Sequence, residues 1–107
     1  MRKLRTTSIA DRDIVESAVW FEQQLGFGLP FLDALDKVLE DIRRRPLSCP
    51  TLVFPGRTLK AQLRWLALGR FPRLVIFQVT DEEVVLYGVL HPHRDLESIL
   101  VARIGTN

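Results

Sequence analysis

Two histidines stand close together near the end of the chain, in the segment His91-Pro92-His93-Arg94-Asp95. Histidine titrates near neutral pH and can move protons while an RNA phosphodiester bond is cut. Such a cut needs a base for the 2′-hydroxyl, a cation for the phosphate charge and an acid for the leaving oxygen. His91, Arg94 and Arg64 could fill these roles. Tyr87 or His93 would then serve as the acid.

The same segment also has a structural interpretation. His91 would end a strand by hydrogen-bonding into the following turn, with Arg94 and Asp95 bracing it. Nothing in the sequence shows that the candidate catalytic groups converge, so we favour the structural interpretation and keep catalysis as a hypothesis.

Neither a metal site nor a reactive cysteine is expected. His91, His93 and Asp95 spell part of a metal-ligand pattern, but a zinc site would need further histidines and the chain has only two. Cys49 is the one cysteine, so it cannot form an internal disulfide, and no local motif ties a histidine to it. We therefore expect no metal and no cofactor.

Positive charge gathers in the middle of the chain. Residues 42–80 contain no Asp or Glu, although the formal net charge is only +2. This stretch carries eight basic residues: Arg43, Arg44, Arg45, Arg57, Lys60, Arg64, Arg70 and Arg73. A field of one sign attracts an acidic partner or nucleic acid, and guanidinium groups suit bidentate contacts with carboxylate or phosphate. The alternative is a solvated face on which charges happen to cluster.

Length and composition indicate one ordinary globular domain over residues 1–107. The chain is 47% hydrophobic and 26% charged, which is unlike a disordered chain. No apolar run approaches the roughly 20 residues of a membrane span, and the basic first residues lead into Thr6-Thr7-Ser8 rather than an apolar stretch. We expect a cytoplasmic protein without a secretory signal, and the single cysteine fits a reducing compartment.

The first half of the sequence predicts a short strand over residues 3–7 and then two helices. Ser8 can cap the first helix, with Asp11 and Asp13 near the positive end of its dipole. Its apolar face should be formed by Ile14, Ala18, Phe21 and Leu25. We favour burial of Trp20 on the flank of the hairpin, with contact to a partner as the alternative. Pro30 can open the second helix, whose apolar face repeats the spacing at Phe31, Leu35, Val38 and Ile42. Arg43-Arg44-Arg45 favours the negative end of its dipole before Pro46 ends it, with contact to a partner as the alternative.

The second half predicts three strands and a terminal helix. Residues 46–56 form an irregular connection rich in proline. Residues 59–67 alternate apolar and polar, with Trp65 among the inward residues, as in a half-buried strand. Residues 74–79 and 84–90 are apolar on both faces and should be central, and residues 94–103 should end in a short helix. The fold class is therefore α+β, in the order β-α-α-β-β-β-α, with the helical hairpin packed on an antiparallel sheet.

Several short motifs occur in order along the chain. They are Ala10 with Asp13-Ile14, Trp20-Phe21, Gly26-Phe27-Gly28 followed by Phe31-Leu32, Arg45-Pro46, Leu63-Arg64, the run Arg70 to Phe77, Val84 to Leu90, and His91 to Asp95. This order and spacing resembles the RelE/ParE family of bacterial toxins, the toxin halves of type II toxin–antitoxin pairs. The resemblance extends from about residue 8 to about residue 103. It departs from the family at Arg73 and Phe77, where tyrosines are usual, and at Leu96, where proline often stands.

The family has two mechanisms. RelE-like members cut messenger RNA on the ribosome with basic residues and often a tyrosine, whereas ParE-like members poison DNA gyrase. The segment from His91 to Asp95 favours the ParE-like branch, and Lys60 is the only lysine available on the sheet. The resemblance thus implies a growth-arrest and plasmid-stabilisation toxin that inhibits gyrase rather than an enzyme. A ribosome-dependent endoribonuclease that uses Arg64, His91 and Arg94 is the alternative, and an inactive antitoxin-binding relic is a third.

The resemblance also implies partners. A cognate antitoxin would fold its acidic, partly disordered tail over the toxin. Its contacts, or those of the target, are expected at five residues of the acid-free stretch: Arg57, Lys60, Arg64, Arg70 and Arg73. The toxin would touch DNA only through the antitoxin complex, and its target would be gyrase or, alternatively, the ribosome and its messenger RNA.

Overall fold

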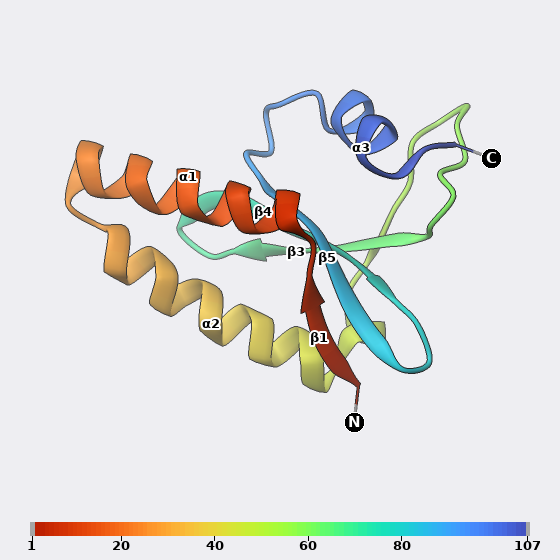
Figure 1. The fold of residues 1–107 in the computed structure, drawn as a ribbon, viewed down its shortest axis with the longest axis horizontal. Coiled ribbons are helices and arrows are strands. Elements are labelled where there is room, and N and C mark those ends of the chain that lie inside the picture. Colours follow the sequence, from red (N-terminus) through yellow and green to blue (C-terminus); the bar gives the residue numbers. More distant parts are fainter. Residues whose placement is uncertain (1, 107) are drawn as a thin grey trace.

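The computed structural model describes residues 2–106 as three layers. Its elements are β1 (Lys3–Thr6), α1 (Ser8–Leu25), α2 (Gly28–Arg44), the 3-10 turn η1 (Pro46–Ser48), β2 (Thr51–Leu52), β3 (Leu63–Leu68), β4 (Phe71–Val79), β5 (Glu83–Leu90) and α3 (Leu96–Ile104). The α1–α2 hairpin covers one face of a twisted sheet and α3 lies at the opposite face (Figure 1). No helix in residues 2–106 is both long and apolar enough to cross a membrane.

The sheet has the strand order β1-β5-β4-β3-β2. β3, β4 and β5 form the predicted antiparallel meander, and β1 pairs in parallel with β5. The predicted α+β class and element order are therefore confirmed. Several boundaries differ: β3 begins at Leu63 rather than near residue 59, β4 begins at Phe71 rather than at residue 74, and α3 begins at Leu96 rather than at residue 94. The connection before β3 also contains the two-residue strand β2, which is too short to leave a periodic signal.

Thr7, and not Ser8, caps α1. Its extended backbone, with ψ of 155°, lets the side chain accept a hydrogen bond from the Ala10 amide at 3.3 Å. The same hydroxyl donates to the Leu86 carbonyl at 2.8 Å, and the Thr7 amide also donates to that carbonyl. Sequence alone favoured Ser8 because both residues can cap. The bond to Leu86 decides for Thr7, since it joins the start of α1 to β5.

The hairpin buries its apolar face against one side of the sheet. Phe31, Leu35 and Ile42 are buried as predicted. Phe21, Phe31 and Phe71 form an aromatic cluster with ring centroids 5.1–5.7 Å apart. Leu25 of the predicted stripe is instead 56% exposed. It lies in the last turn of α1, where the hairpin projects past the sheet (Figure 1).

The opposite face of the sheet has its own smaller core. Buried side chains of the 59–62 connection, β3, β4, β5 and α3 form it: Ala61, Leu63, Ile76, Leu90 and Leu100. Trp65 packs against this core and is half-buried. Burial on both sides explains why β4 from Leu74 onward and β5 from Val84 onward are mostly apolar on both faces, as predicted for central strands.

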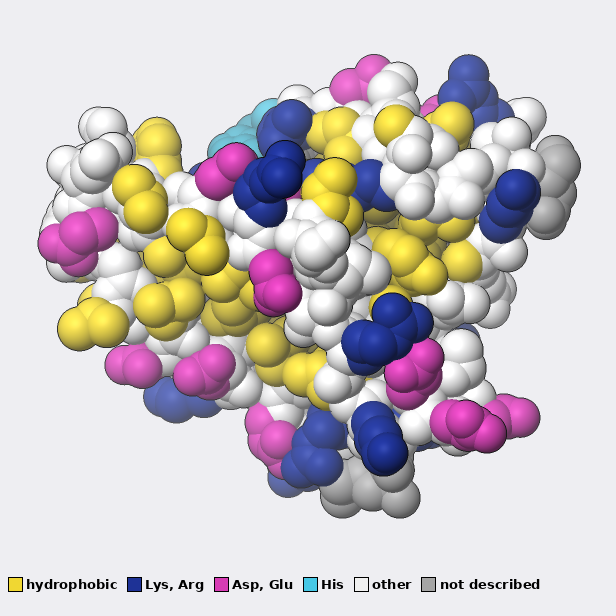
Figure 2. Space-filling model, viewed as in Figure 1, with side chains coloured by type: hydrophobic (Ala, Val, Ile, Leu, Met, Phe, Trp, Pro, Cys, Tyr) yellow, Lys and Arg dark blue, Asp and Glu magenta, His cyan; other side chains and the backbone are white. Residues whose placement is uncertain are grey.

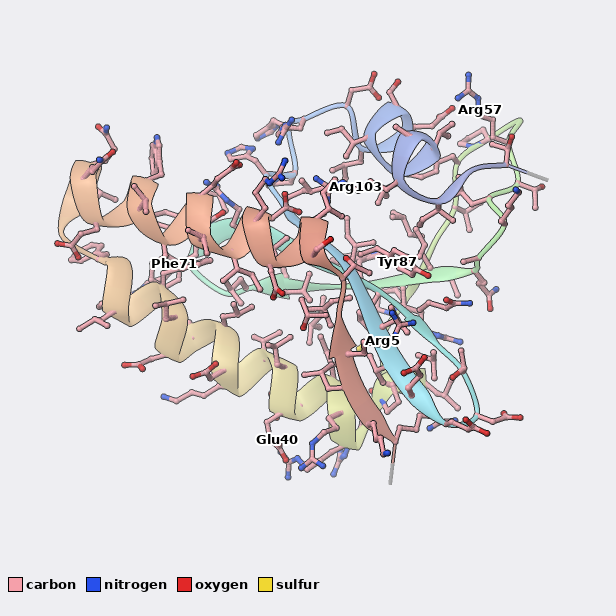
Figure 3. All side chains as sticks on the ribbon, viewed as in Figure 1. Arg5, Glu40, Arg57, Phe71, Tyr87 and Arg103 are labelled. Atoms are coloured by element: carbon pink, nitrogen blue, oxygen red, sulfur yellow. The ribbon has the colours of Figure 1, made fainter. Side chains whose placement is uncertain are left out.

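A buried ion pair connects the two layers that cover the sheet. Asp13 of α1 and Arg103 of α3 are only 7% and 10% exposed, and their side chains form a bidentate pair at 2.6 and 3.0 Å. Asp13 also accepts from the Val89 amide at 3.0 Å, and Arg103 donates to the Tyr87 carbonyl at 2.9 Å. Figure 3 shows Arg103 reaching from α3 toward α1. Asp13 therefore has a structural role in place of the predicted effect on the helix dipole.

We predict that Arg103→Met lowers the free energy of unfolding by about 3–5 kcal/mol, because the Asp13 carboxylate is then buried without its cation. Adding Asp13→Asn should restore part of this loss, since no unpaired charge remains. Urea unfolding followed by circular dichroism measures both changes.

The matched control is Arg5→Met, which breaks the exposed pair between Arg5 and Glu83. This pair lies in solvent, so the midpoint of unfolding should barely move. Equal, small effects of Arg5→Met and Arg103→Met would contradict the structural role of the buried pair.

Candidate functional site

A small cationic pocket lies where β4 begins and β5 ends. Leu74 pairs with Leu90 in the β4–β5 ladder, so the neighbouring residues Arg73 and His91 come to the same end of the sheet. Arg94 and one side of α1 complete a cavity of about 190 Å³. We call it the Arg73 pocket; it is lined by Asp13, Glu16, Ser17, Trp20, Arg73, Val89, Leu90, His91 and Arg94.

Arg73 is held firmly, but not by a carboxylate. Its Nε donates to the Ser17 hydroxyl at 3.0 Å and its Nη1 to the Pro72 carbonyl at 2.8 Å. Its guanidinium carbon lies 4.9 Å from the ring centroid of Phe21 and 5.8 Å from that of Trp20, which is cation–π geometry. Partial burial, followed by repulsion from Arg94, lowers the pKa of Arg73. Both effects indicate a positive charge without local compensation.

His91 has one ring nitrogen committed to the turn that follows β5. Its Nδ1 accepts a hydrogen bond from the His93 amide at 3.1 Å, which is the contact that the structural interpretation expects. Loss of solvation, then the charge of Arg73 and of His93, lowers the pKa of His91 from its ordinary value of 6.5. A catalytic role for His91 stays a prediction. The ring of His93 lies 5.2 Å away, centroid to centroid, but no described hydrogen bond joins the two rings.

Asp95 does not brace His91; it caps α3. Its carboxylate accepts from the Ser98 amide at 3.2 Å and from the Ser98 hydroxyl at 2.7 Å. These bonds stabilise the charged form and lower the pKa of Asp95. Because the carboxylate is bound to the first turn of α3, the expectation that Asp95 braces His91 was wrong.

Arg64 lies at the other end of the strands. It faces Phe77 across the β3–β4 ladder, and its Nη1 donates to the Cys49 carbonyl at 2.6 Å and to the Leu47 carbonyl at 3.4 Å. It therefore fixes the connection after α2. The structure brings together His91 and Arg94 of the proposed ribonuclease trio, but not Arg64.

The acid-free stretch does not form one cationic surface. Arg57 pairs with Glu97 of α3 at 3.1 Å and lies beside that helix (Figure 3). The Lys60 amide donates to the carbonyl of Gly105, directly after α3, so Lys60 is on the same side. Arg70 lies over Phe71 and Phe27 at the projecting end of the hairpin. Acids distant in sequence thus neutralise part of the stretch. Five candidate contact residues are divided among three places: Arg57 with Lys60, Arg64, and Arg70 with Arg73.

Two observations on the described residues concern metal and cysteine chemistry. Within residues 2–106, no group of three or more His, Cys, Asp or Glu side chains could hold a metal ion. Cys49 is buried behind η1, and this burial raises the pKa of its thiol. The thiolate needed for nucleophilic attack is therefore disfavoured.

Ser17 is a site residue that sequence reasoning missed, and the favoured burial of Trp20 was wrong. Trp20 is 47% exposed at the pocket, which leaves it available to a partner, the alternative interpretation of the sequence. It remains exposed because the adjacent Phe21 takes the core-facing position. Asp13 and Ser17 are polar residues at helical spacing between Ala10 and Phe21, all four on the buried face of α1. Polar residues in an apolar stripe were the signal that could have revealed this side of the pocket.

The outer surface of the hairpin is apolar. Figure 2 shows hydrophobic side chains gathered over α1 and α2 on the face turned to the viewer. Val19 and Leu29, 48% and 72% exposed, border a cavity of about 380 Å³ between the helices, together with Ala18, Glu22, Gln23, Gly28 and Leu32. An open apolar patch of this kind is typical of a protein interface.

Comparisons with known proteins identify the fold. No family model and no curated protein sequence matches the chain. Among solved structures, it is similar to a chain of the chromosomal ParDE TA system from P. aeruginosa, with a TM-score of 0.69 and 18% sequence identity. The match covers 85% of this chain and 96% of that chain. The match shows that the two chains share a fold, which agrees with the resemblance found in the sequence.

We predict that the pKa of His91 lies below its ordinary value of 6.5. Arg73→Gln should raise this pKa, because it removes one positive charge that repels the protonated ring. The imidazole proton resonances followed by NMR against pH give both values. Lys37→Gln, on the exposed side of α2, serves as the control and should leave the midpoint in place. An equal midpoint in the wild type and in Arg73→Gln would show that the two groups do not interact.

Proposed function

We propose that this chain is the toxin of a type II toxin–antitoxin pair, acts in the cytoplasm and arrests growth by inhibiting DNA gyrase. The observation that carries the proposal is the shared fold with a ParDE chain over 85% of this chain. The open apolar face of the hairpin supports a protein partner, which we take to be a cognate antitoxin. Any contact with DNA would be made through the antitoxin complex.

The arrangement of the candidate catalytic groups supports gyrase inhibition over RNA cleavage. Arg64 is bound to two carbonyls away from the Arg73 pocket, and His91 Nδ1 is bound to the turn. Phe77 occupies a position at which members of the RelE/ParE family often have tyrosine, so no hydroxyl is available there. Its side chain is also fully buried in the core. Arg64, His91 and Phe77 therefore do not supply the set of groups that RNA cleavage needs, which is a base for the nucleophile, a cation for the phosphate and an acid.

One observation favours the ribosome-dependent endoribonuclease as a second candidate. Arg73, His91 and Arg94 do converge on one pocket, and a cut phosphodiester needs cations near a proton-transfer group. In this case the target would be messenger RNA on the ribosome, and His91→Ala would abolish toxicity.

The proposal is tested by whether DNA synthesis or protein synthesis stops first. After induction of the toxin without antitoxin, pulse labelling with thymidine and with methionine should show DNA synthesis failing before protein synthesis. His91→Ala should remain toxic, because gyrase inhibition requires no proton transfer by this residue. Co-expression of the product of the adjacent reading frame should restore growth.

Other outcomes have distinct meanings. Early failure of protein synthesis, together with loss of toxicity in His91→Ala, would replace gyrase inhibition by RNA cleavage. Unchanged synthesis of both polymers at a verified level of soluble protein would leave only an inactive relic that binds its antitoxin.

A further inference from the structure

The Arg73 pocket contains two arginines without an acidic partner. In the described part of the chain, Arg73 donates only to a hydroxyl and a carbonyl. Arg94 forms no ion pair within residues 2–106. Its backbone amide donates to the His91 carbonyl at 3.1 Å, and its carbonyl accepts from the Leu96 amide at 2.8 Å. His91 and His93 add two more groups that become positive on protonation, with ring centroids 5.2 Å apart. The local charge is therefore strongly one-sided.

The acids of α1 form no ion pair with these two arginines in the described part of the chain. Both carboxylate oxygens of Asp13 are bound by Arg103, and one of them also accepts from the Val89 amide. Glu16 lines the pocket but forms no ion pair within residues 2–106. An anion from outside the chain would thus gain favourable interactions that the folded protein itself leaves unmade.

We propose that the Arg73 pocket receives a carboxylate side chain from an acidic segment of the antitoxin. This inference rests on the toxin function proposed above and names the chemistry of its partner contact. The carboxylate lies between Arg73 and Arg94, beside the ring of Trp20. A half-exposed tryptophan next to arginine has the composition of an interface hot spot.

The pocket suits one carboxylate better than a nucleic-acid backbone. A nucleic acid is held by a row of cations that contact successive phosphates. Here the remaining basic candidates lie elsewhere, with Arg57 paired to Glu97 and Arg64 bound to carbonyls. On the other side of α1, the apolar hairpin groove can take apolar residues of the same protein segment. A protein segment can bind both the cationic Arg73 pocket and the apolar groove, while a phosphate backbone would bind only the Arg73 pocket.

Binding of the carboxylate is coupled to protonation of His91. Arg73 of β4, with Arg94 and His93 of the segment after β5, faces His91 with positive charge, while Glu16 and the paired Asp13 face it from α1. A bound carboxylate offsets the repulsion and raises the pKa of His91. The complex then takes up a proton, so its affinity increases as the pH falls from 8 toward 6.

The experiment uses as partner the candidate antitoxin, which is the protein encoded by the reading frame next to the gene for this chain. Isothermal titration calorimetry measures the affinity and the proton uptake. Arg94→Gln removes an exposed cation, and His91→Asn can keep an acceptor for the His93 amide, so both variants should fold. Lys37→Gln is the matched control for loss of charge. We expect roughly five- to tenfold weaker binding for Arg94→Gln, unchanged binding for Lys37→Gln, and proton uptake by the wild type that disappears in His91→Asn.

A second arm needs no protein partner. Glutarate is added to the toxin alone, and the His91 ring is titrated by NMR. We expect its midpoint to rise with glutarate in the wild type and in Lys37→Gln, and to stay constant in Arg94→Gln.

The outcomes separate the two proposals. A complex of unchanged affinity in Arg94→Gln, without proton uptake, overturns the carboxylate pocket and leaves the toxin function standing. Absence of any complex with the wild type overturns the proposed antitoxin pairing and the partner assignment with it, even where glutarate shifts His91. A constant His91 midpoint in the wild type with glutarate also counts against the pocket.

Discussion

Asp13 of α1 and Arg103 of α3 meet beside β5, so one buried ion pair joins the two layers on opposite faces of the sheet. Gly88 leaves room for the contact, because a Cβ at this position would lie 2.9 Å from Arg103 Nη1 and the guanidinium would have to shift. It also fixes the rotation of α1. With Asp13 turned toward β5, Ser17 reaches Arg73 and Trp20 reaches the surface of the pocket. The candidate site is thus a consequence of how the helices are anchored.

The sequence predicted the arrangement of elements well because their periodicity is strong. The apolar spacing of α2 defines one helix face that can pack on a sheet. The apolar runs of β4 and β5 are typical of strands in the centre of a sheet. The boundaries were less determined. Thr7 caps α1 through a bond to Leu86, a residue distant in sequence, and β2 exists only because β3 offers it a partner. Local propensity contains neither piece of information.

Prediction of the site was limited for the same reason. Residue types identified Arg73, His91 and Arg94 as candidates, but sequence clustering also suggested one broad cationic surface that included Arg57 and Arg64. Folding divides that surface, since Glu97 and the carbonyls near Cys49 engage these two arginines. The contribution of α1 to the pocket could not be derived from charge patterns. It depends on the rotation of one helix, which the buried ion pair sets.

The most direct test of the central claim is the supercoiling activity of purified DNA gyrase in the presence of this purified protein. The proposed gyrase inhibition predicts loss of supercoiling with increasing protein and full recovery when the proposed antitoxin is added. It also predicts no cleavage of messenger RNA on translating ribosomes by the same preparation. Full gyrase activity at toxin concentrations that cut ribosome-bound RNA would contradict the claim. The chain would then belong functionally with the ribonucleases.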